Sequence, residues 1–280
     1  IETSMKKEEY KKKVAKIKDY IKAGEAFQIV LAQRFSIRLP DGFNSLSLMT
    51  KKGKTEQEPV YSYHFNFGDF AYVGFSPESF IKIKNNKVSL RALAGTRPRG
   101  VSQLIDQKLE KELVLCEKEN AEHLMLVDLG RNDLGRISKT GSVKVGEIAR
   151  VVKYEKVMHL KTDIESELSP QKSVFDAIKA CFPRGTVSGA PKRRALSILS
   201  ELEPEERGIY SGCAGTIDSE GTVDLAIAIR SATIHNGIAH IQAGAGIVYD
   251  SSPEGEYMET VHKASSIIEP IKNLINQMRS

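Results

Sequence analysis

Apolar residues recur at helical spacing near the start of the chain. Tyr10, Val14 and Ile17 lie three and four residues apart within 6–23, and Gly24 follows them. This spacing places the apolar side chains on one side of a helix, and glycine is a common helix stop. The pattern therefore predicts a helix over 6–23. Similar patterns predict helices over 104–130, 173–180, 191–202 and 254–278.

Runs rich in β-branched and aromatic residues predict strands between these helices. The run 27–38 is the longest at the N-terminal end. Three short runs over 61–67, 70–75 and 79–83 predict consecutive antiparallel strands, with turns at 68–69 and 85–86. Further strands are expected over 88–94, 143–145, 149–159, 210–217, 222–233 and 238–243, and a polar loop over 51–59. Hairpin-connected strands with helices at intervals indicate the α+β class.

Composition narrows the classes of protein. The chain has 280 residues, of which 40% are hydrophobic, a net charge of +5 and no Trp. Much of the positive charge lies on the N-terminal helix among glutamates, which is typical of a solvated helix face, so a nucleic-acid partner is not expected. Three widely spaced cysteines predict no disulfide framework. No apolar run is long enough to span a bilayer, and we expect a cytoplasmic protein without a membrane partner.

Candidate chemistry gathers where the last predicted strand meets the last helix. Gly244 and Gly246 leave open backbone, and Ser252-Pro253 is a typical helix start. In the helix that follows, Glu256, Glu259 and Lys263 share one face. A magnesium ion with a small carboxylate ligand would suit this set. The alternative is that Glu259 and Lys263 form an ordinary surface ion pair.

Two glycine-rich segments resemble nucleotide motifs but break their patterns. Gly244-Ala-Gly246 is followed by Tyr249 where a dinucleotide fingerprint has its third glycine. The segment 185–192 places Ala-Pro before Lys192 and Arg after it, unlike a phosphate-binding loop. The helix predicted over 104–130 carries a second acidic pair, Glu119 and Glu122, beside an apolar stripe that includes Leu115, Leu126 and Leu129.

Eight motifs cover nearly the whole chain, and they are Phe27–Leu31, Ser76–Glu78, Ala94–Gly100, Glu122–Gly135, Val157–His159, Gly185–Lys192, Ala226–Arg230 and Gly244–Thr260. In this order they resemble the motifs of the chorismate-utilising enzymes. Within that family the chain is most similar to the anthranilate synthase large subunits, component I. The resemblance implies a single chorismate-binding catalytic domain over residues 1–280, with two packed antiparallel sheets flanked by outer helices.

The resemblance also implies a magnesium cofactor. Glu122 and Glu259 match the family's metal ligands, and Glu119 and Glu256 match nearby partners that act through water. Magnesium favours few carboxylates, several waters and the substrate's own anion, which agrees with such a set.

Further residues match the family's substrate contacts and catalytic groups. Arg230 and Tyr210 match positions that hold the enolpyruvyl carboxylate. The family's contacts to the substrate ring and carboxylate are matched by Lys263, Thr186, Gly95, Thr96, Gly244, Ala245 and Gly246. Glu78 matches the general acid that lets the C4 hydroxyl leave as water. His159 matches a histidine of the later pyruvate elimination, and its alternative is a hydrogen-bonded packing residue.

Two positions indicate the branch of the family. Isochorismate and salicylate synthases carry a water-activating lysine where this chain has Gln28, and a neutral amide cannot act as that base. Many aminodeoxychorismate synthases carry a nucleophilic lysine where this chain has Ala94. We therefore expect anthranilate and pyruvate from chorismate and ammonia. Aminodeoxychorismate synthesis, or chorismate binding with little turnover, remains open.

The resemblance further implies a glutamine amidotransferase partner that supplies ammonia, since nothing in the chain resembles a glutaminase. Large subunits of this family carry an N-terminal region that holds a tryptophan site, and we expect this chain to lack it. Ala92-Leu93 and Arg184 depart from the commoner residues near the expected cleft.

Overall fold

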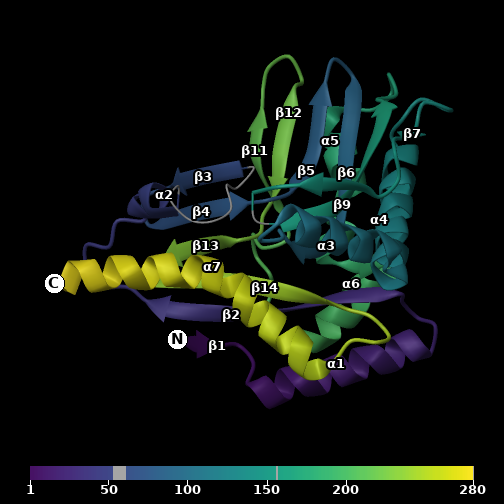
Figure 1. The fold of residues 1–280 in the computed structure, drawn as a ribbon. Coiled ribbons are helices and arrows are strands. Elements are labelled where there is room, and N and C mark those ends of the chain that lie inside the picture. The colour runs from purple at the N-terminus through teal and green to yellow at the C-terminus, as the bar shows by residue number, and fades with distance from the viewer. Residues whose placement is uncertain (53–60, 156, 280) are drawn as a thin grey trace. The chain divides into compact units, whose positions relative to one another are not determined.

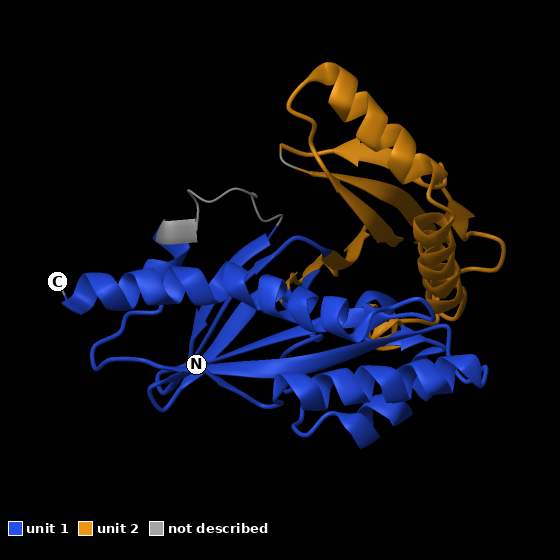
Figure 2. Ribbon diagram, turned by 60° about the horizontal axis from the view of Figure 1, so that its bottom comes forward, with its two compact units in different colours: residues 1–78, 183–214, 226–280 blue, residues 79–182, 215–225 orange. Residues whose placement is uncertain are grey.

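The computed structural model describes residues 1–52, 61–155 and 157–279 (Figure 1). The chain divides into two compact units, which Figure 2 colours separately. The first unit comprises Ile1–Glu78, Pro183–Ala214 and Ala226–Ser280, and the second comprises Ser79–Phe182 and Gly215–Leu225. The sequence predicts that residues 1–280 act as a single catalytic domain, and this stays a prediction.

A seven-stranded antiparallel sheet forms the first unit. Its order is β1-β2-β14-β13-β4-β3, and β10 also pairs with β2. The strands are β1 (Glu2–Thr3), β2 (Gln28–Arg38), β3 (Tyr61–Asn66), β4 (Phe70–Ser76), β10 (Gly189–Ala190), β13 (Ser231–His235) and β14 (Ile238–Ile247). The helices are α1 (Lys7–Lys22), α2 (Ser47–Lys52), α6 (Lys192–Leu202) and α7 (Pro253–Arg279).

Alternation along β2 separates the two faces of this sheet. Ile29 and Leu31 pack in one core cluster with residues of α1 and α6, and Phe35 and Ile37 pack in another with residues of α7. The intervening residues face the other side, since side chains alternate along a strand. Gly244 and Gly246 of β14 pair with Ala32 and Val30, so they share that other face. Gln28 lies on it too, which gathers several expected site residues there.

Local signals explain where the helices of the first unit begin and end. Tyr10, Val14 and Ile17 are the buried residues of α1, as their spacing predicts. The helix stops before Gly24, whose φ of +77° suits glycine. The expected N-cap of α7 is confirmed, because the Ser252 hydroxyl accepts a hydrogen bond from the Gly255 amide at 2.9 Å.

The second unit has its own seven-stranded antiparallel sheet with helices against it. The order is β11-β12-β5-β6-β9-β7, and β8 also pairs with β9. The strands are β5 (Ser79–Lys84), β6 (Lys87–Pro98), β7 (Lys144–Val145), β8 (Arg150–Lys153), β9 (Val157–Glu167), β11 (Cys213–Ile217) and β12 (Val223–Ile227). The helices are α3 (Gln103–Leu115), α4 (Glu117–Gly135) and α5 (Val174–Cys181). The α+β class with two antiparallel sheets is confirmed.

The single helix expected over 104–130 is wrong. Cys116 adopts an extended conformation, with φ −74° and ψ 103°, and separates α3 from α4. The Asn120 side-chain amide donates to the carbonyls of Val114 and Cys116 at 2.7 and 3.0 Å, which satisfies groups exposed by the break. The glycine-rich exit expected after residue 127 is also wrong, because it is helical as far as Gly135. Leu115 is 77% exposed and belongs to no apolar stripe of α4.

Some strand boundaries differ from the predictions. The strand expected over 222–233 is two strands, β12 and β13, separated at Arg230, whose φ is +52°. β6 does not end at Ala94 but continues through a register shift at Gly95 to Pro98. β4 and β5 follow one another but belong to different sheets, so their expected pairing is wrong. In the loop expected over 51–59, residues 51–52 end α2 and the rest lie outside the described residues.

In the described residues, no helix is long and apolar enough to cross a membrane. Over the described residues, Cys116, Cys181 and Cys213 form no disulfide bond.

Candidate functional site

Glu78 lies at the end of β4, where the segment Ser76-Pro-Glu turns. The Ser76 hydroxyl accepts from the Glu78 amide at 3.2 Å and donates to its carbonyl at 3.1 Å, which shapes the turn. The Thr186 hydroxyl donates to Glu78 Oε1 at 3.1 Å. Burial raises the pKa of Glu78, although the Arg184 charge, the Thr186 hydrogen bond and the Lys263 charge oppose this. Glu78 therefore keeps its proton to a higher pH than an ordinary glutamate, which suits an acid.

Tyr210 lies against the glycine face of β14. Burial raises the pKa of Tyr210 to about 12, against the opposing charges of Arg207 and Arg230. A Cβ on Gly244 would lie 2.9 Å from the Tyr210 hydroxyl and 3.0 Å from a Val30 methyl. The sequence suggested that glycine leaves this backbone open to a ligand, and in the structure Tyr210 makes the close approach.

Gln28 is likewise accommodated by a glycine. It is 3% exposed, and a Cβ on Gly246 would lie 2.6 Å from its side-chain nitrogen. Between the two glycines, Ala245 is fully buried and pairs with Leu31, whose side chain lies in the core cluster with α1 and α6. The side chain of Ala245 therefore faces the core, and Gln28 belongs to the opposite face.

Arg230 and Lys263 connect α7 with the sheet. Arg230 Nη1 donates to the Lys263 carbonyl at 2.8 Å and contacts Ser266 Oγ at 3.4 Å, and burial lowers the pKa of Arg230. Lys263 Nζ donates to the Gly244 carbonyl at 2.9 Å and pairs with Glu259 Oε1 at 2.5 Å. Two cations are thus held together, Lys263 at the Gly244 carbonyl and Arg230 at the Lys263 carbonyl, and an anionic ligand would be favoured there.

The expected acidic face of α7 is present. Glu256 and Glu259 are one turn apart at the start of the helix, and the Glu259 side chain is 47% exposed. The Glu259–Lys263 ion pair considered from the sequence is also present. An ion pair of this exposure adds little stability, so it leaves the carboxylate available to a cation.

In the second unit, His159 on β9 is fixed by the irregular part of β6. Its Nδ1 lies 2.9 Å from the Gly95 carbonyl and 3.0 Å from the Thr96 hydroxyl. A carbonyl can only accept, so this geometry assigns the proton to Nδ1 and leaves Nε2 as the basic nitrogen. The edge of the Tyr154 ring lies against the imidazole, with centroids 5.8 Å apart. Both the packing role and the proton-transfer role of His159 agree with these contacts.

Gly95 permits this arrangement through its backbone. Its φ is +65°, and a Cβ there would lie 2.8 Å from Leu113 Cδ1 and 3.1 Å from Glu119 Oε2. Glu119 Oε1 accepts from Arg97 Nη1 at 3.2 Å, and the same nitrogen donates to the Thr96 carbonyl at 2.8 Å. Glu119 is therefore tied to the Gly95-Thr96 segment. Glu122 lies one turn further along α4 and is half-buried.

The donor types suit magnesium, which binds through one or two carboxylates, waters and substrate oxygens. Glu256 and Glu259 form one pair on a helix face, and Glu119 and Glu122 form another. In the part of the chain that the structure describes, no group of three or more His, Cys, Asp or Glu side chains is placed to hold a metal ion. Magnesium binding stays a prediction.

The expected residues fall into two sets. The first unit brings together Gln28, Glu78, Thr186, Tyr210, Arg230, Gly244, Ala245, Gly246 and Lys263, with Glu256 and Glu259 on the same helix as Lys263. The second unit brings together Gly95, Thr96, Glu119 and His159, and carries Glu122 on α4. The sequence reasoning missed Glu203, Arg207, Arg99 and Asp106, which hold these sets. The only signal was the i,i+4 spacing of Glu203 and Arg207 just after a helix.

Similarity to known proteins shows the family of the chain. A family model for chorismate binding enzymes matches residues 1–269. Anthranilate synthase component 1 of Pseudomonas aeruginosa is 45% identical over 269 residues, which cover 96% of this chain and 54% of that protein. The corresponding protein of Lactococcus lactis is 45% identical over 267 residues, 95% of this chain and 58% of its own length. The chain thus spans little more than half the length of these relatives.

The chain is also similar to solved structures. The crystal structure of anthranilate synthase component I from Streptococcus pneumoniae has a TM-score of 0.88 and 42% identity, over 95% of this chain and 58% of that one. The menaquinone-specific isochorismate synthase of Escherichia coli has a TM-score of 0.85 and 25% identity, over 96% of this chain and 62% of that one. With a family match over almost all of its length, the chain belongs to the family of chorismate binding enzymes.

Proposed function

We propose that the chain carries the large-subunit reaction of anthranilate synthase, in which chorismate and ammonia give anthranilate, pyruvate and water. The observation that carries this proposal is Gln28, a buried neutral amide where isochorismate and salicylate synthases have a lysine. An amide cannot deprotonate water at neutral pH, so a nucleophile that needs no such base is favoured. The relatives named anthranilate synthase component 1 support the same branch.

Glu78 is the proposed general acid. Ammonia adds at C2 of chorismate, the ring double bonds shift, and the C4 hydroxyl takes a proton from Glu78 and leaves as water. The raised pKa of Glu78 supports this role, because a donor must hold its proton near the working pH. The Thr186 hydroxyl orients the carboxyl by donating to Oε1, so Oε2 would deliver the proton.

Arg230 and Tyr210 are proposed to bind the enolpyruvyl carboxylate. A guanidinium offers donors in a plane that matches a carboxylate, and a tyrosine kept neutral by its raised pKa can donate a further hydrogen bond. Lys263 and the Gly244 backbone would orient the same end of the substrate. In the second step His159 Nε2 would accept the C2 proton as pyruvate leaves and the ring becomes aromatic.

Magnesium would be held by Glu122 and Glu259, with Glu119 and Glu256 acting through water, and would balance the substrate's negative charge. The ammonia would come from a glutamine amidotransferase component, since the relatives are named as the first component of a synthase. Lys263 would orient Glu259 through their ion pair.

The proposal is tested by incubating the chain with chorismate, magnesium chloride and ammonium chloride, then measuring anthranilate fluorescence and pyruvate. Equal amounts of both products support it. Chorismate loss without pyruvate would indicate an aminodeoxychorismate synthase, and isochorismate would indicate the activity named for the Escherichia coli neighbour. Chorismate binding without turnover would indicate a binding module.

The metal assignment has a matched control on the same helix. Glu259→Gln and Glu122→Gln should each raise the magnesium concentration for half-maximal activity by about tenfold or more, since each removes an anionic ligand. Glu269→Gln alters a carboxylate of α7 that pairs with Lys272 far along the helix, and it should leave the magnesium requirement unchanged. Equal magnesium requirements in all three variants would overturn the assignment.

A further inference from the structure

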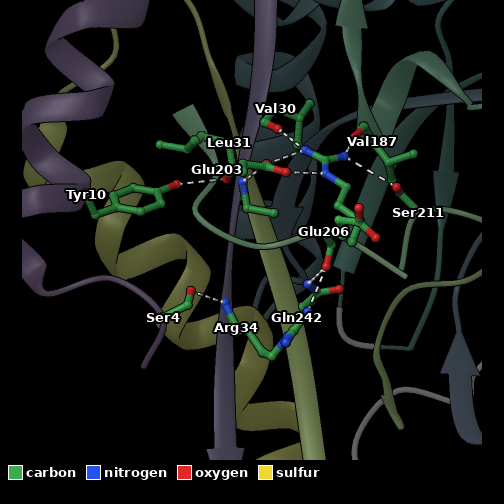
Figure 3. A network of polar contacts seen from close by, with 12 residues as sticks. Ser4, Tyr10, Val30, Leu31, Arg34, Val187, Glu203, Glu206, Ser211 and Gln242 are labelled. Atoms are coloured by element: carbon green, nitrogen blue, oxygen red, sulfur yellow. Dashed lines mark hydrogen bonds and ion pairs between the residues drawn. The ribbon is translucent and has the colours of Figure 1, made fainter. Parts of the chain in front are cut away.

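A mostly buried ion pair between Glu203 and Arg207 belongs to the polar network of the first unit that Figure 3 shows. Glu203, at the end of α6, accepts two hydrogen bonds from Arg207, at 2.6 Å from Nη2 and 2.7 Å from Nε. The two side chains are 9% and 14% exposed. This parallel two-bond geometry is the strongest that a guanidinium and a carboxylate form, and it fixes the plane of the guanidinium.

The fixed guanidinium contacts separate segments of the unit. Nη2 donates to the Val30 carbonyl of β2 at 2.7 Å, and Nη1 donates to the Val187 carbonyl at 2.5 Å (Figure 3). Val187 ends the short 3-10 turn η1 (Gly185–Val187). Nη1 also lies 3.4 Å from the Ser211 hydroxyl. Arg207 therefore joins the strand β2, the turn η1 and Ser211 of its own loop.

Two of the residues that Arg207 contacts lie next to expected site residues. Val187 follows Thr186, which donates to Glu78, and Ser211 follows Tyr210. The guanidinium carbon also lies over the Tyr210 ring, 5.6 Å from its centroid. A shift of Arg207 would therefore move both the Thr186 turn and the Tyr210 ring.

The loop that carries Arg207 is itself anchored. Glu203 Oε1 accepts from the Ala32 amide at 2.8 Å, so the carboxylate is bound to β2 as well as to Arg207. Arg34 Nη2 donates to the Glu206 carbonyl at 2.7 Å, and the Gln242 amide lies 3.5 Å from the same oxygen (Figure 3). These contacts hold residues 203–207 to β2 and β14, which makes the Arg207 position rigid.

We propose that Arg207, oriented by Glu203, is a positioning residue that sets Tyr210 and the Thr186 turn for the carboxylate end of the substrate. The proposal rests on the proposed function, because it gives Tyr210 a ligand to bind. Arg207 itself does not touch the reacting atoms. Its planar fork supplies donors in fixed directions to two carbonyls and a carboxylate, which a lysine ammonium cannot reproduce.

The variant Arg207→Lys keeps the charge and removes the fork. The matched control is Arg194→Lys, because Arg194 also pairs with a carboxylate, Glu25, but contacts no expected site residue. We expect Arg207→Lys to raise the KM for chorismate by about tenfold, with a smaller fall in kcat, because misplacement of a binding group weakens substrate binding. Arg194→Lys should change KM by less than about twofold.

A double-mutant cycle separates positioning from stability. In a Tyr210→Phe background, which already lacks the phenol hydroxyl, Arg207→Lys should raise KM by only about twofold, since the two changes act on one contact. Its effect on Tm should be the same in both backgrounds. Equal increases in KM with and without the Tyr210 hydroxyl would overturn the proposal and leave Arg207 a stability residue.

A second measurement needs no turnover. The chain carrying ring-labelled ¹³C tyrosine should show a Tyr210 resonance, assigned by its loss in Tyr210→Phe, and this resonance should shift or broaden in Arg207→Lys but not in Arg194→Lys. An unchanged resonance in Arg207→Lys would also overturn the proposal. A wild-type chain that forms no anthranilate would contradict the proposed function alone, while this resonance still decides the positioning role.

Discussion

The two units hold their expected site residues with buried ionic centres of opposite sign. In the first unit the centre is a cation, Arg207, which donates to a carboxylate and two backbone carbonyls. In the second unit it is an anion, Asp106 in the first turn of α3. Asp106 accepts from Arg99 at 2.8 and 3.1 Å and from the Gly100 amide at 2.9 Å, and it lies 3.2 Å from Lys153 Nζ.

The anionic centre reaches His159 through a short chain of contacts. Arg99 Nη1 donates to the Tyr154 carbonyl at 2.7 Å, and the Tyr154 ring lies against the imidazole. The Asp106 side chain is 10% exposed, but its partners Arg99 and Lys153 are 33% and 34% exposed. In the first unit both members of the ion pair are mostly shielded from solvent, with side chains 9% and 14% exposed. Loss of one partner should therefore cost more stability in the first unit, since solvent can compensate a charge only where it reaches it.

The largest effect is expected for Glu203→Gln. The change keeps the shape of the side chain but leaves the Arg207 charge buried without its carboxylate, and it should lower the free energy of unfolding by about 3 kcal/mol. Urea denaturation of wild type and variant measures this difference. A loss no larger than that of a surface ion pair would show that water or another acceptor reaches Arg207, and the contrast between the units would disappear.

The second effect concerns the side chains that lie against a glycine backbone in each unit. Gly244 has an ordinary φ and meets Tyr210, whereas Gly95 has a φ of +65° and meets Leu113 and Glu119. Gly95→Ala combines a strained backbone with overpacking, so it should lower the free energy of unfolding by about 2 kcal/mol. Gly244→Ala lacks the backbone strain and should cost less. The same denaturation series measures the free energy of unfolding of both variants. Equal losses would show that the close contacts of the added methyl group, and not the backbone strain at Gly95, determine the loss of stability.

Segments with a clear periodic pattern were predicted well. The helix over 6–23 and the N-cap at Ser252 are confirmed, because three- and four-residue spacing and capping are local signals. The break at Cys116 has no glycine or proline to mark it, and the positive φ of Arg230 is uncommon for a residue with a side chain. The assignment of β4 and β5 to different sheets depends on long-range pairing, which alternation within a strand does not encode.

The same division applies to the site. The family resemblance named Glu78, Tyr210 and His159, and the structure describes the surroundings of each. The family resemblance did not name Arg207 or Asp106. Their roles arise from contacts between segments that are far apart in the chain, such as Val30 with Arg207, and no local pattern records such contacts.

A smaller effect, which depends on pH, is expected for Asp106→Asn. The hydrogen bonds from Arg99, followed by that from the Gly100 amide, hold the pKa of Asp106 well below its usual range. A carboxylate whose pKa is lower in the folded chain than in the unfolded chain stabilises the fold when the pH is above the unfolded-state pKa of about 4. This stabilisation is lost as the pH falls toward the folded-state pKa. The variant should lower Tm by about 3 °C at pH 7.

The gap between the melting curves of wild type and Asp106→Asn should therefore narrow as the pH falls below about 4, because Asp106 of the unfolded wild-type chain then begins to take up its proton while Asp106 of the folded chain stays ionised. Scanning calorimetry from pH 7 to acid conditions measures it. A gap that stays constant over this range would mean that the asparagine disturbs packing, and that the charge of Asp106 does not contribute to stability.

The smallest effect is expected at an ionic pair that solvent reaches from both sides. Glu269 and Lys272 on α7 lie 3.0 Å apart, with side chains 57% and 46% exposed. Glu269→Gln should change the free energy of unfolding by less than about 0.5 kcal/mol, because water screens the pair in the folded state and replaces it in the variant. With Glu203→Gln and Asp106→Asn it completes a series of three acid-to-amide changes ordered by the exposure of the cationic partner, which is 14% for Arg207, 33% for Arg99 and 46% for Lys272. If Glu269→Gln lowered the free energy of unfolding as much as Glu203→Gln does, ion pairs of similar length would stabilise the fold equally at any exposure. The comparison of the two units depends on the opposite, namely that a shielded ion pair is costlier to break than an exposed one.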